Sequence, residues 1–130
     1  MSKILIVDDD PDMVEAGRLV LEREGHAVES ASNVTQGMKK IEETNPDLLI
    51  LDVMMEEYDD GLRMARDIRR AGNQVPILML TSVNRALGLQ IDKDGEMVPV
   101  DDFVEKPVDP ATLVAKVNNL LEKKKTQEDK

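Results

Sequence analysis

The sequence predicts an α/β fold, a doubly wound parallel sheet of five strands with helices on both faces. Short apolar runs alternate five times with amphipathic segments along the 130 residues. The clearest run, Leu48 to Leu51, is apolar at consecutive positions, which is typical of a strand covered on both faces. Helix-start signals after such strands indicate helical crossovers, which give a parallel sheet with right-handed connections.

The expected strands are short runs rich in apolar and β-branched side chains. They are residues 4–7, 27–31, 47–52, 75–80 and 102–105, of which 27–31 has the weakest pattern.

The helices are predicted mainly from their ends. Asp10-Pro11 and Asp109-Pro110 each place a capping carboxylate before a proline at the first helical position. Asn33 followed by Gln36 resembles a capping box, and Gly25 supplies the stop of the first helix. These signals predict the first, second and last helices.

The remaining elements are less regular. A helix is expected between Gly61 and Gly72, whereas the pattern degrades from Asn84 to Val100, where we expect a short helix near residues 85–91 and then an irregular loop. No linker divides the chain. We therefore expect one domain over residues 1–123 and a polar, frayed tail over residues 124–130.

Composition excludes several classes of function. The chain has no cysteine, which rules out disulfides and thiol chemistry and fits a cytoplasmic protein. No apolar run approaches the roughly 20 residues of a membrane span. The net charge of −10 argues against direct nucleic-acid binding, which requires a basic face. The single His26 lies between two expected elements and is interpreted as a turn residue.

Four of the five expected strands end in residues suited to chemistry, whereas the second ends in Ser32-Asn33, which have nothing distinctive. Ligands of a doubly wound sheet bind outside the carboxyl ends of its strands, so the residues at those four strand ends are the site candidates. They are Asp8 and Asp9 after the first strand, Asp52 at the third, Thr81 at the fourth and Lys106 after the fifth.

This set of residues indicates phosphoryl transfer. Converging carboxylates repel one another, and a hard divalent cation such as Mg²⁺ relieves that repulsion through oxygen ligands. The hydroxyl of Thr81 and the ammonium group of Lys106 are suited to phosphate oxygens. A single aspartate at a strand end is more often a cap or turn residue, and Asp10 and Asp109 are interpreted in that way. The prediction depends on all four strand ends agreeing.

The same residues resemble the receiver domain of two-component response regulators, and are similar to the chemotaxis receiver protein, over about residues 3–122. The matching motifs, in family order, are Ile-Leu-Ile-Val-Asp8-Asp9-Asp10, Leu-Leu-Ile-Leu-Asp52-Val-Met-Met, Leu-Met-Leu-Thr81-Ser82 and Phe103-Val-Glu-Lys106-Pro107. The resemblance implies the flavodoxin-like (βα)5 fold with strand order 2-1-3-4-5, an order for which a member of this family is the standard example.

The resemblance also implies roles for the site residues. Asp52 would be the phosphoacceptor, taking its phosphoryl group from a phosphohistidine on a sensor histidine kinase or a histidine phosphotransfer protein. Asp9 and Asp52 would bind Mg²⁺ directly, Asp8 mostly through water, and Met54 through its backbone carbonyl.

Further implied roles concern the switch. Thr81 and Lys106 would contact the phosphoryl oxygens, and the Lys106–Pro107 bond would be cis. Phe103 would be the aromatic switch residue, for which core packing is the alternative. The region of the fourth helix, fifth strand and fifth helix would contact a downstream protein target or mediate a phosphorylation-dependent homodimer.

The sequence departs from the family pattern in three places. In the loop after Asp52, Glu56 stands where the family usually has a proline. This loop is also one residue longer before Gly61 than the family's usual loop. The segment from Thr81 to Lys106 is about three residues longer than in most members of the family. The position of Ser82 is often occupied by alanine or glycine in the family. The first two departures bear on partner recognition, and the third narrows the path to Asp52.

Two other functions remain as alternatives to a phosphorylated receiver, which is either a stand-alone protein or part of a longer regulator. One is a pseudo-receiver binding module without phosphorylation, against which the intact site residues argue. The other is an aspartyl-phosphate phosphatase, which would use a second aspartate two residues after the nucleophile, where this chain has Met54. We expect no enzymatic turnover of external substrates and slow self-dephosphorylation, since neither Met54 nor Val83 can polarise water.

Overall fold

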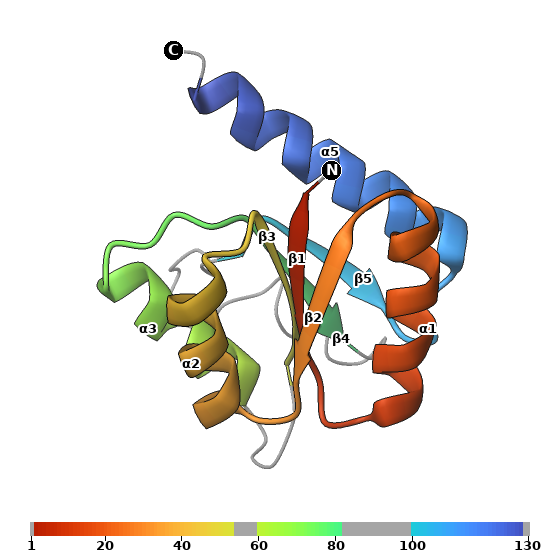
Figure 1. Ribbon diagram of the computed structural model, residues 1–130. Coiled ribbons are helices and arrows are strands. Elements are labelled where there is room, and N and C mark those ends of the chain that lie inside the picture. The colour runs from red at the N-terminus through yellow and green to blue at the C-terminus, as the bar shows by residue number, and fades with distance from the viewer. Residues whose placement is uncertain (1, 54–59, 82–99, 129–130) are drawn as a thin grey trace.

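Five parallel strands form the centre of the fold in the order β2-β1-β3-β4-β5 (Figure 1). The computed structural model describes residues 2–53, 60–81 and 100–128, the last five as backbone only. The strand order and the doubly wound architecture confirm the predicted fold class. The elements in chain order are β1 Lys3–Val7, α1 Pro11–Arg23, β2 Ala27–Ala31, α2 Val34–Thr44, β3 Leu48–Asp52, α3 Asp60–Arg70, β4 Ile77–Thr81, β5 Asp102–Glu105 and α5 Pro110–Glu128.

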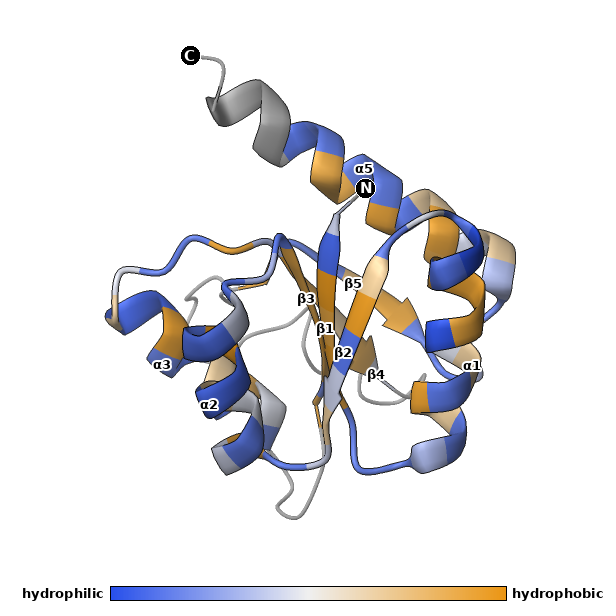
Figure 2. Ribbon diagram, in the orientation of Figure 1, coloured by the Kyte–Doolittle hydropathy of each residue, from blue (hydrophilic) through white to orange (hydrophobic). Residues whose placement is uncertain are grey.

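The helices cover both faces of the sheet: α2 and α3 lie on one face and α1 and α5 on the other (Figure 1). Each central strand therefore contributes to two cores. In β1, Leu5 and Val7 join the core under α2 and α3, whereas Ile4 and Ile6 join the core under α1 and α5. This alternation follows from the two-residue period of a strand. Figure 2 shows the result, with apolar strands between helices whose outer surfaces are polar.

The predicted helix starts are present. The Asp10 side chain accepts a hydrogen bond from the amide of Asp12, and Pro11 opens α1. Asn33 accepts from the amide of Gln36 at 2.8 Å, as in a capping box. The return bond differs from the expected one, because the Gln36 Oε1 accepts from the amide and hydroxyl of Ser32. The first turn of α2 is therefore tied to the end of β2.

Several element ends differ from the sequence prediction, and the two largest differences are at the start of β4 and the end of α5. β4 begins at Ile77 and not at Val75, because the backbone groups of Val75 are bonded to side chains: its amide donates to Asn73 Oδ1 and its carbonyl accepts from Arg69. α5 runs to Glu128, past the expected end at residue 123. The irregular segment expected from Asn84 to Val100 lies outside the described residues, except for Val100.

Candidate functional site

The predicted site residues lie at the carboxyl edge of the sheet. Asp8 follows β1, Asp52 closes β3, Thr81 closes β4 and Lys106 follows β5. The registers Asp52↔Leu80 and Thr81↔Glu105 bring three of these strand ends to the same level. In Figure 1 this is the edge at which α1 and α2 begin, opposite the N-terminus.

The three aspartates form a cluster. Carboxylate oxygens of Asp8, Asp9 and Asp52 all lie within 4.8 Å of one another. Asp8 and Asp52 are 1% and 5% exposed, whereas Asp9 faces solvent. The backbone holds Asp8 from two sides, because its amide donates to Ala31 at 3.1 Å and its Oδ1 accepts from the amide of Asp10 at 3.0 Å.

Lys106 bridges the two buried carboxylates. Its Nζ lies 3.1 Å from Asp8 Oδ2 and 3.4 Å from Asp52 Oδ2. Its amide donates to the carbonyl of Thr81 at 2.8 Å, which fixes the start of the side chain beside β4. The Lys106–Pro107 peptide bond is cis, as the family resemblance implied.

The charges of this cluster are unbalanced. Burial, followed by the negative charge of Asp8, raises the pKa of Asp52 to about 7, although the Lys106 charge acts in the opposite direction. Burial lowers the pKa of Lys106, but the two carboxylates outweigh this and raise it above the usual lysine value. The two shifts therefore differ in cause: burial and repulsion by Asp8 act on the acid, whereas attraction to two carboxylates acts on the lysine.

The donor set fits a hard divalent cation. Asp8 Oδ2 is buried, and among the described residues the group that contacts it is the ammonium group of Lys106. When all three carboxylates are ionised, they and one ammonium group leave two negative charges, the charge that one Mg²⁺ neutralises. A groove of about 510 Å³ between the start of α1 and the end of β2 opens onto Asp8 and Asp9.

The other predicted residues are placed as follows. Thr81 is 1% exposed at the end of β4. Phe103 is half-buried, pairs in register with Met79, and packs against the core under α2 and α3. Met54, Ser82, Val83 and Glu56 lie outside the described residues.

Sequence reasoning missed two contributions to this site. Asp10 was interpreted as a cap alone, but its amide also orients Asp8; the unbroken run of three aspartates was the available signal. Gly61 was interpreted as the start of a helix, but it lies against the backbone of Asp52. That contact depends on tertiary packing, for which the sequence carries no local signal.

Comparison with known proteins identifies the family. The model of the response regulator receiver domain matches residues 4–118. The chain belongs to the response regulator receiver domain family. Members of this family are phosphoacceptors and not classical enzymes, typically bind Mg²⁺, and interact with histidine kinases and effector domains.

Individual relatives are similar to this receiver over most of its length. The alkaline phosphatase synthesis transcriptional regulatory protein PhoP of Bacillus subtilis is 36% identical over 123 residues, which cover 92% of this chain and 48% of the relative. The transcriptional regulatory protein CpxR homolog of Haemophilus influenzae is also 36% identical, with 93% and 51% covered. This chain therefore spans about half the length of these curated relatives.

Solved structures agree on the fold of the receiver. A putative response regulator from Chloroflexus aurantiacus superimposes with a TM-score of 0.81 at 31% identity, covering 93% of this chain and 98% of that one. A CheY-like response regulator receiver domain protein from Methanospirillum hungatei gives 0.81 at 25% identity, with 98% of each chain covered. Among the described residues, none of the helices is long and apolar enough to cross a membrane.

Proposed function

We propose that Asp52 accepts a phosphoryl group from a phosphohistidine on a sensor histidine kinase or a histidine phosphotransfer protein. The observation that supports this most directly is the position of the Asp52 carboxylate, 3.4 Å from Lys106 and within one cluster with Asp8 and Asp9. In the transfer, a carboxylate oxygen of Asp52 forms a bond to phosphorus as the phosphorus–nitrogen bond of the phosphohistidine breaks.

The acidic cluster would hold the Mg²⁺ that this reaction needs. We assign Asp9 and Asp52 as direct ligands, Asp8 as a ligand mostly through water, and the backbone carbonyl of Met54 as a further ligand. When bound, the cation neutralises charge on the transferring phosphoryl group. The exposure of Asp9 leaves the solvent side of the cluster open for the incoming donor.

Lys106 and Thr81 would bind the phosphoryl oxygens once they are attached to Asp52. The ammonium group of Lys106 lies 3.4 Å from Asp52 Oδ2, so phosphoryl oxygens attached to Asp52 would lie close to it. Thr81 lies one residue beyond the register partner of Asp52 on the neighbouring strand.

Phosphorylation would switch protein contacts through Phe103. This side chain is half-buried and packs against the core under α2 and α3, so a change in its position would alter both that core and the surface beside β5. Phe103 lies on β5, in the region that we propose as the output face together with α5 and residues 82–99. The output is either a downstream protein target or a phosphorylation-dependent homodimer, in a cytoplasmic stand-alone receiver or in a longer regulator.

Incubation with Mg²⁺ and acetyl phosphate, followed by mass spectrometry of the intact protein, tests the proposal. We expect the mass to increase by one phosphoryl group in the wild type and not in Asp52→Asn. Asp10→Asn is the matched control, because it removes a charge at the same edge while asparagine still caps α1. An unmodified wild type would indicate a pseudo-receiver, and rapid multiple turnover would indicate a phosphatase.

The lifetime of the phosphorylated protein tests the expected slow self-dephosphorylation. Met54 and Val83 have no group that could position or polarise an attacking water. We therefore expect the added mass to persist after the phosphodonor is removed. Decay as fast as that of chemotaxis receivers would contradict this expectation.

A further inference from the structure

Gly61 lies where α3 comes closest to the phosphoacceptor strand. A Cβ built on Gly61 would overlap the carbonyl oxygen of Asp52, and would lie 2.7 Å from Val53 Cα and 2.8 Å from Asp52 C. These are backbone atoms of the phosphoacceptor and of the next residue. No side-chain rotation can therefore relieve the overlap, and either the strand end or the helix must move.

The backbone between Asp52 and Val53 is fixed from two sides. On the sheet side, the amide of Val53 donates to the carbonyl of Leu80 at 3.0 Å. On the helix side, the amide of Gly61 donates to the carbonyl of Val53 at 2.8 Å. Val53 is itself 3% exposed, within the core under α2 and α3. The helix thus holds the strand end by a close backbone contact.

The conformation of Gly61 does not explain why glycine is needed here. Gly25 and Gly72 have positive φ angles of 90° and 87°, which only glycine adopts readily, whereas Gly61 is not among the positive-φ residues. The requirement at Gly61 is therefore one of space beside Asp52.

Gly37 provides a contrast in the same core. A Cβ at Gly37 would also be crowded, with Met64 Cε at 2.9 Å and Val7 Cγ2 at 3.1 Å. Those atoms belong to side chains and not to the backbone of the phosphoacceptor strand. Both positions are crowded, so crowding alone does not distinguish them. They differ in the atoms that an added methyl group would displace, which are backbone atoms at Gly61 and side-chain atoms at Gly37.

We propose that Gly61 is a positioning residue for phosphorylation: its missing side chain lets α3 contact the Asp52–Val53 peptide and so sets the direction of the Asp52 carboxylate. This inference rests on the proposed phosphorylation of Asp52. The carboxylate must be aligned with Lys106 and with the acidic cluster at once, and a displacement on the order of 1 Å at a reacting group can cost about 100-fold in rate.

The test compares Gly61→Ala with Gly37→Ala in the full chain. Phosphorylation by acetyl phosphate with Mg²⁺ is followed by intact mass, and each rate is corrected for the folded fraction measured by circular dichroism. We expect Gly61→Ala to be slowed by about 30-fold to 100-fold. Gly37→Ala should stay within about threefold of the wild type, since its added methyl group reaches only side chains.

A second readout follows the site without requiring transfer. Mg²⁺ with beryllofluoride, which mimics the phosphoryl group, should raise the Tm of the wild type and of Gly37→Ala, because a ligand of the folded state stabilises it. In Gly61→Ala this increase should be lost or strongly reduced. A purely structural role would lower the Tm of the variant but leave the ligand-induced increase intact.

Each contrary result overturns the inference. Phosphorylation of Gly61→Ala as fast as that of Gly37→Ala would do so, as would retention of the full increase in Tm. Gly61→Ala could also fail to fold where Gly37→Ala folds, in which case glycine serves the fold and not the placement of Asp52. If the wild type shows neither phosphorylation nor the increase in Tm, the proposed function itself fails, and this inference fails with it.

Discussion

Asp52 combines burial with a neighbouring negative charge, and this has a consequence for stability in the absence of a metal. Its pKa is raised to about 7 by burial and by Asp8. The folded protein therefore keeps this proton up to about pH 7, whereas an unfolded aspartate releases it at about pH 4. Between these values the folded state binds more protons, so the contribution of Asp52 to stability falls as the pH rises.

The variant Asp52→Asn tests this consequence. Asparagine resembles the protonated acid and does not ionise. Without divalent cations, we expect its free energy of unfolding to exceed that of the wild type by about 1–3 kcal/mol at pH 8 and by clearly less at pH 5. Urea denaturation with a chelator present measures both. An equal difference at the two pH values would contradict the role of the raised pKa.

Lys106 balances the charge of the acidic cluster and, in the proposed function, binds a phosphoryl oxygen. One substitution separates these two roles. Lys106→Met keeps the length of the side chain but removes the cation shared by Asp8 and Asp52. Mg²⁺ binding should be retained or strengthened, because the cluster becomes more negative. Phosphorylation should fall by about tenfold or more, the loss expected for one charge-assisted hydrogen bond to a phosphoryl oxygen. Calorimetric Mg²⁺ titration and intact mass provide the two measurements, and a parallel loss of both would argue against this separation.

At the scale of elements, one arginine joins α3 to the strands at the edge opposite the site. Arg69 Nη1 donates to the carbonyls of Asn73 and Val75, and Nη2 forms an ion pair with Asp101 at 3.0 Å. The same Asp101 oxygen accepts from the amide of Ile77, where β4 begins. Side-chain hydrogen bonds therefore hold the connection between α3 and β4, before the strand begins at Ile77.

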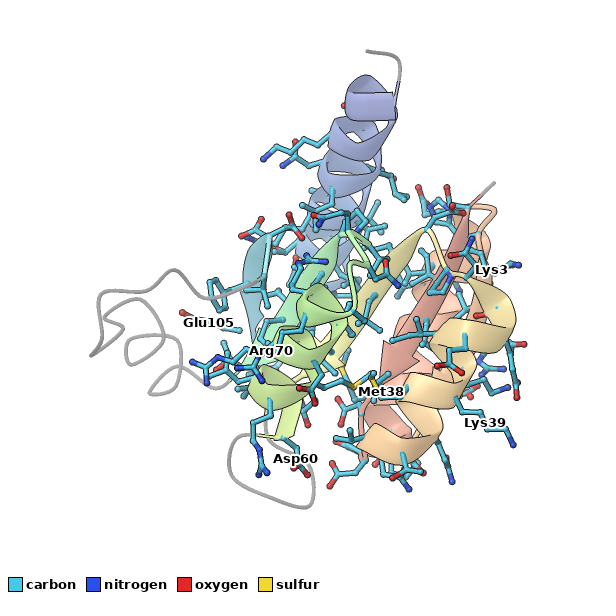
Figure 3. All side chains as sticks on the ribbon, turned by 90° about the vertical axis from the view of Figure 1, so that its left-hand side faces the viewer. Lys3, Met38, Lys39, Asp60, Arg70 and Glu105 are labelled. Atoms are coloured by element: carbon cyan, nitrogen blue, oxygen red, sulfur yellow. The ribbon has the colours of Figure 1, made fainter. Side chains whose placement is uncertain are left out.

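Arg69→Met should therefore be destabilising by about 2–3 kcal/mol, since it leaves two carbonyls and a carboxylate without this partner. Arg70→Met is the matched control on the same helix. The pair of Arg70 with Asp67 is 4.0 Å long and both side chains are exposed, so its loss should change stability by less than about 0.5 kcal/mol. Figure 3 shows Arg70 on the outer side of α3. Urea denaturation of both variants checks the contrast, and equal losses would contradict it.

The sequence predicts elements where the signal is local. β2 and β5 have the expected bounds, and Asp10 and Asn33 cap the expected helices. The predicted start of β4 was wrong by two residues, because the observed start depends on Arg69, a side chain from the preceding helix.

The same distinction applies to the site. Asp8, Asp9, Asp52 and Lys106 were predicted to meet because strand ends converge in a parallel sheet, and they do. Two contacts were not predicted: the hydrogen bond from the Asp10 amide to Asp8, and the contact of Gly61 with Asp52. Strand register and helix packing decide them. Asp60 begins α3 in Figure 3, and Met54, the remaining predicted ligand, lies outside the described residues.

At the scale of the whole molecule, negative charge opposes the folded state. The chain carries a net charge of −10, and part of it is concentrated in the cluster of Asp8, Asp9 and Asp52. Salt of any kind screens general repulsion, whereas a cation that binds the cluster acts only through the folded state. The two effects can be separated by comparing Mg²⁺ with NaCl at equal ionic strength.

We expect Mg²⁺ at pH 8 to raise the free energy of unfolding by about 2–3 kcal/mol when it exceeds its dissociation constant about 100-fold. NaCl of equal ionic strength should give only a small part of this increase. At pH 5 the gain should shrink, because the proton retained by Asp52 competes with the cation for the same oxygens. Asp52→Asn should lose most of the gain at either pH, whereas Asp10→Asn should keep it. If NaCl stabilised the protein as much as Mg²⁺ does, the acidic cluster would act as part of a repulsive surface and not as a metal site.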